Sequence, residues 1–205
     1  MTHKIKIYSL LMHFQHNKVP ITWDSYKFVQ DYKRQMLTNV TKLLNDHNIK
    51  FVICYGNLLE YERGKPIYRD DDIDIIFDVK DIKKWEYVCN SNNRRFTKYN
   101  LIFDTRFKNM KRQKINGIQC QLIKYENKEN RKEYKMDIHC DIVASVVRNK
   151  FWPDLNIDFY NLRKVELYNV KTYAPSKLDT VRILTETYGP EYIIPNTRNP
   201  FKIYK

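Results

Sequence analysis

Glycine and cysteine are scarce in this sequence of 205 residues, and long hydrophobic runs are absent. It has only four glycines, whereas glycine makes up roughly 7% of the residues of an average protein. We therefore expect each glycine where the backbone requires one. The four cysteines are Cys54, Cys89, Cys120 and Cys140. They contain no C-x-x-C pair, which argues against a disulfide framework and a zinc knuckle and favours buried thiols in a reducing compartment.

No segment approaches the ~20 consecutive apolar residues of a membrane span. The apolar stretch at residues 7–12 is also shorter than the core of a signal peptide. We therefore expect a soluble, cytoplasmic protein without a signal peptide or membrane span. Hydrophobic residues make up 42% and aromatic residues 14% of the chain, which excludes a disordered protein. A chain of this length is expected to form one domain, residues 1–205.

The formal net charge of +13 favours anionic partners. Residues 106–135 contain ten Lys or Arg and three Glu. Nucleic acid is therefore a possible partner, although runs of charge commonly form solvated surface.

Hydrophobic periodicity predicts alternating helices and strands. A helix is expected at residues 22–47 with Thr22 as N-cap, then a strand at 50–55 that Gly56 stops. A short helix at 57–63, a strand at 72–79 and a helix at 81–92 follow. Further predicted elements are a strand at 99–104, a hairpin turn at 116–117, a strand at 134–143, a strand pair at 165–173 and a helix at 176–187. This order predicts a single α/β or α+β domain.

Asp72 and Asp74 are alternate residues of the strand predicted at 72–79, so both should lie on one face. Two carboxylates that close repel each other, and a bound cation is the usual remedy. Oxygen ligands of this kind favour Mg²⁺ or Mn²⁺. The alternative is a solvated turn at 70–72 with Asp74 protecting a strand edge. Aspartate is disfavoured within strands, which makes this alternative weaker.

The strand predicted at 134–143 repeats the pattern. Asp137, His139 and Asp141 share one of its faces, so this strand can supply a third carboxylate. His139 is more often a structural hydrogen-bonding residue than a base. Gly56, directly after a strand, favours a turn whose N–H groups approach a phosphate, although an ordinary strand-end turn gives the same pattern.

Several segments together resemble the LicD-like phosphotransferase family, which includes fukutin-related proteins. They are Tyr55-Gly56-Asn57-Leu58-Leu59 with Arg63, the run from Ile67 to Ile75, Cys140-Asp141-Ile142-Val143, Tyr173-Ala174-Pro175 and Tyr188-Gly189-Pro190. The family shows G-T-L-L-G-x-x-R followed by I-P-W-D-D-D-x-D, in the same order and spacing. The similarity covers about residues 25–195. Asn57 replaces the usual Thr or Ser, Glu60 replaces the second Gly, and Tyr68-Arg69 replaces Pro-Trp.

The resemblance implies a nucleotidyltransferase-type mixed β-sheet flanked by helices. It also implies that Asp72 and Asp74 bind Mg²⁺ and that Asp141 completes the ligand set, with Asp137 as the alternative third ligand. Gly56 and Asn57 would line the diphosphate of the donor, and Arg63 would stabilise the site.

The resemblance predicts transfer of a phospho-alcohol, such as phosphocholine or ribitol phosphate, from a CDP-linked donor to a glycan hydroxyl. One alternative is a nucleotidyltransferase that uses a nucleoside triphosphate to modify RNA, protein or a small molecule. Another, of a different class, is a non-catalytic basic module that binds nucleic acid.

Overall fold

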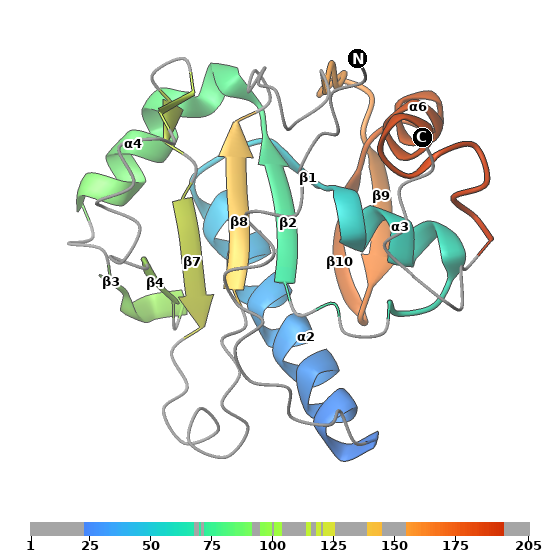
Figure 1. Ribbon diagram of the computed structural model, residues 1–205. Helices are drawn as coiled ribbons and strands as arrows, with labels where there is room; N and C mark the ends of the chain where they lie inside the picture. Colours follow the sequence, from blue (N-terminus) through green and yellow to red (C-terminus); the bar gives the residue numbers. More distant parts are fainter. Residues whose placement is uncertain are drawn as a thin grey trace, which may run out of the picture.

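The computed structural model describes residues 23–67, 70, 72–91, 95–99, 101–103, 114–115, 118–119, 121–125, 139–144 and 155–194. Six strands in this part of the chain form one mixed sheet in the order β1-β2-β8-β7-β4-β3 (Figure 1). They are β1 (Phe51–Ile53), β2 (Asp72–Phe77), β8 (His139–Ala144), β7 (Gln121–Tyr125), β4 (Leu101–Phe103) and β3 (Arg95–Phe96). Only β2 and β8 pair in parallel; the other neighbouring strands of this sheet are antiparallel.

Two short antiparallel ribbons accompany this sheet. One pairs β5 (Lys114–Ile115) with β6 (Ile118–Gln119), at the predicted hairpin. The other pairs β9 (Arg163–Leu167) with β10 (Val170–Ala174). The turn of this second ribbon consists of Tyr168 and Asn169, which both have positive φ angles, 52° and 61°. A two-residue turn of this kind matches the twist of the two strands, but it is unfavourable for a tyrosine.

Helix α2 (Trp23–Asp46) crosses one face of the sheet, behind β8 and β2 in Figure 1. Its apolar stripe is fully buried at Met36, Leu37, Val40, Leu43 and Leu44, and each such side chain contributes about 1.5–3 kcal/mol by leaving water. Helices α3 (Tyr55–Arg63) and α6 (Lys177–Tyr188) pack together beside the β9–β10 ribbon. A 3₁₀ turn (Val79–Asp81) leads into α4 (Ile82–Ser91), and another (Thr97–Tyr99) precedes β4.

The predicted α+β class, a mixed sheet flanked by helices, is confirmed. Most predicted elements also appear within a few residues of their expected bounds. The strand predicted at 99–104 is shorter, because residues 97–99 form the 3₁₀ turn. Of the strand predicted at 134–143, residues 139–144 are seen as β8, while residues 134–138 lie outside the described part. Thr22, the predicted N-cap of α2, also lies outside it.

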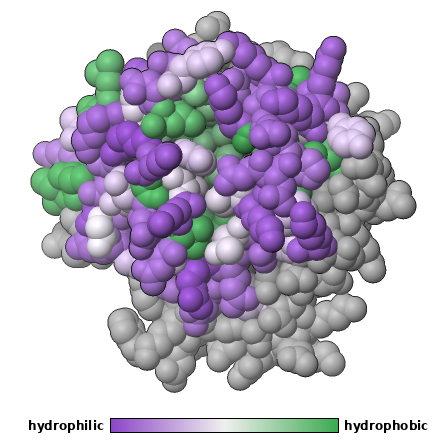
Figure 2. Space-filling view, turned by 180° about the vertical axis from the view of Figure 1, so that it is seen from behind, coloured by the Kyte–Doolittle hydropathy of each residue, from purple (hydrophilic) through white to green (hydrophobic). Residues whose placement is uncertain are grey.

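Seen from the opposite side, the described surface is mainly hydrophilic with small, separate hydrophobic areas (Figure 2). None of the helices in the described part of the chain has the length and apolar character needed to cross a membrane. Cys54, the cysteine whose side chain is described, is buried and carries a free thiol.

Candidate active site

Strand β2 presents two carboxylates from one face. Asp72 and Asp74 are partly exposed, whereas Ile73 and Ile75 between and after them are fully buried. The alternation follows from the pleat of a strand, in which successive side chains point to opposite sides. β2 therefore holds the two aspartates near solvent at the predicted spacing.

Strand β8 places a third aspartate at the level of the first two. In the parallel β2–β8 pair, Asp74 is the register partner of Asp141, and Asp72 is the register partner of His139. Register partners of adjacent strands occupy the same face of a sheet. Only the backbone of β8 is described, and Asp137 lies outside the described residues. The register thus brings the positions of Asp74 and Asp141 together.

The N-terminus of α3 lies directly beside this pair. The backbone N–H of Cys54 donates to the carbonyl of Asp74 at 3.1 Å, so the chain enters α3 level with Asp74. The backbone N–H of Gly56 then donates to Oδ2 of Asp74 at 3.3 Å. The helix dipole makes this end of α3 favourable for anions, and the carboxylate of Asp74 lies there, bonded to the N–H of Gly56.

Gly56 is the second residue of α3, so the helix begins two residues earlier than the predicted bound of 57. Tyr55 makes the sharp entry instead, with a positive φ of 43°. Gly56 is required for space: a Cβ at this position would lie 3.1 Å from Oδ2 and 3.4 Å from Oδ1 of Asp70. The glycine therefore lets α3 pack closely against the residue that leads into β2.

Asn57 is fully buried and faces β2. Its Oδ1 accepts a hydrogen bond from the N–H of Asp74 at 2.6 Å. Its Nδ2 donates to the carbonyl of Asp72 at 3.4 Å and to the hydroxyl of Tyr168 at 3.2 Å. The structure shows the amide of Asn57 holding the aspartate-bearing strand; the role that the resemblance implies for it, lining a donor diphosphate, stays a prediction.

A buried charge network lies beneath these groups. Lys33 of α2 is fully buried, and its Nζ lies 2.6 Å from Oδ2 of Asp70 and 3.3 Å from both carboxylate oxygens of Glu60. Burial alone would lower the pKa of Lys33, but the charges on Asp70 and Glu60 outweigh it and raise that pKa. For Glu60 and Asp70, burial raises the pKa and the charge of Lys33 lowers it; burial is the larger effect, so both pKa values are raised.

The sequence reasoning did not single out Lys33. A signal was present, because Val29, Lys33 and Leu37 are spaced by four and form one buried row of α2. A lysine in such a row indicates a buried partner of opposite charge.

Arg63 lies at the opposite end of α3 from Gly56, about 10 Å along the helix axis at 1.5 Å per residue. Its Nε donates to the carbonyl of Tyr192 at 2.7 Å, and its guanidinium also reaches the carbonyl of Ile194 at 3.4 Å. The structure therefore places Arg63 against the segment after α6 and away from the two aspartates.

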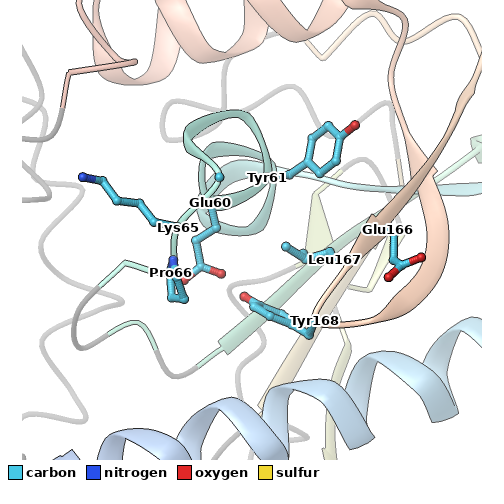
Figure 3. Close-up of a pocket in the computed structure, with 8 residues that line it drawn as sticks. Glu60, Tyr61, Lys65, Pro66, Glu166, Leu167 and Tyr168 are labelled. Carbon is cyan, nitrogen blue, oxygen red and sulfur yellow. The ribbon is translucent and has the colours of Figure 1, made fainter.

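A cavity of about 410 Å³ opens between α3 and the tip of the β9–β10 ribbon. Its walls are formed by Glu60, Tyr61, Gly64, Lys65, Pro66, Glu166, Leu167 and Tyr168. In Figure 3 the ring of Tyr168 lies at the ribbon tip near Leu167, and Lys65 extends outward from the end of α3. Tyr168 links this cavity to the site, because its hydroxyl accepts a hydrogen bond from Asn57; the lining residues themselves include none of β2.

The donor groups on β2 fit a hard divalent cation. Mg²⁺ typically takes one or two protein carboxylates and completes its shell with water and phosphate oxygens, and Asp72 and Asp74 are partly exposed. Within the described residues, no three His, Cys, Asp or Glu side chains are grouped to hold a metal ion.

No protein-family profile matches the sequence, and no curated protein matches it. The resemblance to the LicD-like family therefore rests on the sequence motifs alone. Solved structures similar to this chain include the solution structure of the antibiotic-resistance factor ANT(2'')-Ia, with 9% identity and a TM-score of 0.39, covering 76% of this chain and 69% of that one.

A crystal structure of ANT(2'')-Ia in complex with adenylyl-2''-tobramycin is similar at 10% identity, with a TM-score of 0.37, over 68% of this chain and 66% of that one. An antigenic nucleotidyltransferase-like protein from Paracoccidioides brasiliensis is similar at 14% identity, with a TM-score of 0.45, over 76% of this chain and 64% of that one. This chain thus spans about two thirds of the length of each. Likeness at this level assigns neither a reaction nor a substrate.

Proposed function

We propose that this chain is a divalent-metal-dependent nucleotidyltransferase, which transfers a nucleoside monophosphate from a nucleoside triphosphate to an acceptor hydroxyl. The observation that carries the proposal is the position of Asp72 and Asp74 on β2. They stand at the N-terminus of α3, and Asp74 is level with Asp141 of β8. Transfer from a phosphoanhydride requires carboxylates that bind a cation, and beside them helix N–H groups that bind a phosphate.

Each residue has a distinct part in this proposal. Asp72 and Asp74 would hold Mg²⁺, which when bound neutralises charge on the phosphates. The first turn of α3 at Gly56 would receive a phosphate oxygen. Asn57 keeps Asp72 and Asp74 in place through its bonds to their backbone.

Asp141 is assigned to the acceptor hydroxyl. In the proposed step, the hydroxyl oxygen bonds to the α-phosphorus while the bond to the bridging oxygen breaks, and pyrophosphate leaves. Asp141 orients the hydroxyl and takes its proton. The cavity beside Tyr168 is the proposed place for the body of the acceptor, since its volume is in the range of small-molecule sites.

The test is incubation with Mg²⁺, each α-labelled nucleoside triphosphate, and separate pools of RNA, protein and small hydroxyl compounds. We expect Mg²⁺-dependent transfer of label and release of pyrophosphate. Asp72→Asn and Asp74→Asn should lower the rate by at least about 100-fold. Asp31→Asn is the matched control, because Asp31 is an exposed aspartate on α2.

Full transfer by both β2 variants would contradict the proposed site. Absence of transfer, together with RNA affinity that falls steeply with salt and is unchanged in both variants, would favour the nucleic-acid-binding module.

A second candidate is transfer of a phospho-alcohol from a CDP-linked donor to a glycan hydroxyl. It is favoured by the order and spacing of the segment from Tyr55 to Arg63 and the run from Ile67 to Ile75. A nucleoside triphosphate and a CDP-linked alcohol both contain a phosphoanhydride, so the same residues can serve both reactions. The two reactions differ in which phosphorus atom the hydroxyl attacks. Release of CMP from CDP-choline or CDP-ribitol, without pyrophosphate release from triphosphates, would select this candidate.

A further inference from the structure

Lys33 is a buried charge that the proposed reaction does not use. It belongs to α2, far along the chain from the residues that bear the carboxylates, and its side chain has no exposed surface. The charge is nevertheless kept, because two carboxylates surround it, Asp70 and Glu60. A buried ion pair of this kind is often no more stabilising than apolar side chains of the same volume. Stability alone therefore does not explain a lysine at this position.

Asp70 is held by Lys33 at two atoms. The ammonium lies 2.6 Å from Oδ2 of Asp70 and 3.3 Å from its backbone carbonyl. The N–H of Asp70 donates to the carbonyl of Ile67 at 3.2 Å. The residue two positions before Asp72 is thus fixed through both its side chain and its backbone.

Asp70 in turn sets how closely α3 approaches β2. Its carboxylate is the nearest group to the space that a Cβ of Gly56 would occupy. Gly56 is also the residue whose N–H reaches Asp74. Movement of Asp70 would therefore change the spacing between the N-terminus of α3 and the two aspartates.

Glu60 extends the same link to α3. It contacts Lys33 with both oxygens, and its Oε1 accepts from the N–H of Ile67 at 2.7 Å. The ring of Tyr168 covers the ammonium, with its centroid 5.3 Å from Nζ. One ammonium therefore joins α2, α3 and the segment that leads into β2.

We propose that Lys33 is a positioning residue for the cation site: through Asp70 and Glu60 it fixes the N-terminus of α3 relative to Asp72 and Asp74. This inference rests on the proposed function. Lys33 contacts neither substrate nor cation, and it acts on the affinity for the cation and on the alignment of the phosphate. Residues that orient metal ligands in this indirect way commonly change metal affinity by about 10- to 100-fold when they are replaced.

The test compares Lys33→Met with a triple variant, Lys33→Met with Glu60→Gln and Asp70→Asn. The single variant leaves two buried carboxylates without their cation and is expected to fold poorly. The triple variant removes all three charges together and keeps similar side-chain shapes. Lys42→Met is the control, since Lys42 is an exposed lysine on the same helix.

The readout is Mn²⁺ binding by calorimetry, with the thermal midpoint measured separately. We expect the triple variant to fold and to bind Mn²⁺ at least about tenfold more weakly, with Lys42→Met unchanged. A folded triple variant with wild-type Mn²⁺ affinity would overturn the proposal. Failure of the triple variant to fold would also overturn it, because the network would then maintain the fold and not the site.

The wild-type protein separates this proposal from the proposed function. If the wild-type protein does not bind Mn²⁺, or if Asp72→Asn with Asp74→Asn binds it equally well, the cation site itself is wrong. If wild-type binding depends on those two aspartates and the triple variant matches it, only the role of Lys33 fails.

Discussion

Oδ1 of Asn57 accepts a hydrogen bond from the backbone N–H of Asp74 at 2.6 Å. The same amide donates to the carbonyl of Asp72. One buried side chain of α3 therefore holds the backbone on both sides of Ile73, and the two aspartates are presented as a unit.

Replacing Asn57 by alanine should uncouple α3 from β2. It removes three hydrogen bonds of a fully buried side chain, so we expect a loss of about 1–3 kcal/mol in the free energy of unfolding. Transfer activity should fall by at least about tenfold, as the carboxylates lose their alignment. Urea unfolding and turnover measure the two effects. Asn45→Ala, at an exposed position of α2, should leave both unchanged; equal behaviour of the two variants would refute this role of Asn57.

Two glycines should respond differently to alanine. In Gly56→Ala the new Cβ meets Asp70, which Lys33 holds in place, so Mn²⁺ affinity should fall. The free energy of unfolding should change by less than about 1 kcal/mol, because alanine also favours the helix.

Gly64→Ala is the matched control. Gly64 has a φ of +64° and open space around it. Alanine there should cost about 1 kcal/mol of stability and leave Mn²⁺ affinity intact. Isothermal titration and thermal unfolding of both variants provide the comparison, and a loss of Mn²⁺ affinity in Gly64→Ala alone would reverse our assignment of the two glycines.

Stability should fall as the pH rises through neutrality. Burial raises the pKa of Glu60 to about 7, against the opposing effect of Lys33. A carboxyl whose pKa is raised in the folded state gives stability that is fully present below its unfolded pKa and is lost as the pH passes the folded one. We expect the free energy of unfolding to be greater at about pH 5.5 than at about pH 8, by about 1–3 kcal/mol.

Glu60→Gln should weaken this dependence without abolishing it, because burial also raises the pKa of Asp70 to about 7. The amide oxygen can still accept from the N–H of Ile67, but the side chain no longer titrates. Glu62 affects stability in a different pH range. Burial raises its pKa, but Lys177 and Arg163 outweigh burial and lower that pKa. Its contribution to the free energy of unfolding is therefore lost only under more acidic conditions. Urea unfolding of the wild-type protein and of Glu60→Gln at several pH values measures the free energy of unfolding of each. A free energy of unfolding that increases with pH in the wild-type protein would rule out the proposed role of Glu60.

The sequence predicted the elements around the site because their signals are local. The alternation Asp-Ile-Asp-Ile specifies a strand with one polar face, and the scarcity of glycine drew attention to Gly56. The family resemblance implied that Asp141 completes the ligand set, with Asp137 as the alternative. The pairing of β8 with β2, which places Asp141 beside Asp74, does not follow from periodicity.

The roles of Asn57, Tyr168 and Lys33 depend on tertiary contacts and were not predicted. Asn57 and Tyr168 are far apart in the sequence and meet only when the β9–β10 ribbon packs against α3. Lys33 is one of 37 Lys and Arg residues in the chain, and composition does not distinguish it from an ordinary surface lysine. Its spacing of four from Val29 and Leu37 is the sequence signal that was missed, and the packing of α2 shows that all three are buried.

The parallel pairing of β2 with β8 also has a consequence for synthesis of the protein. Strand β8 enters the sheet between β2 and β7, so one edge of β2 has no partner until residues 139–144 have been made. Exposed strand edges promote aggregation, and charged side chains on an edge oppose it. Asp72 and Asp74 would thus protect the nascent chain from self-association before they serve any cation.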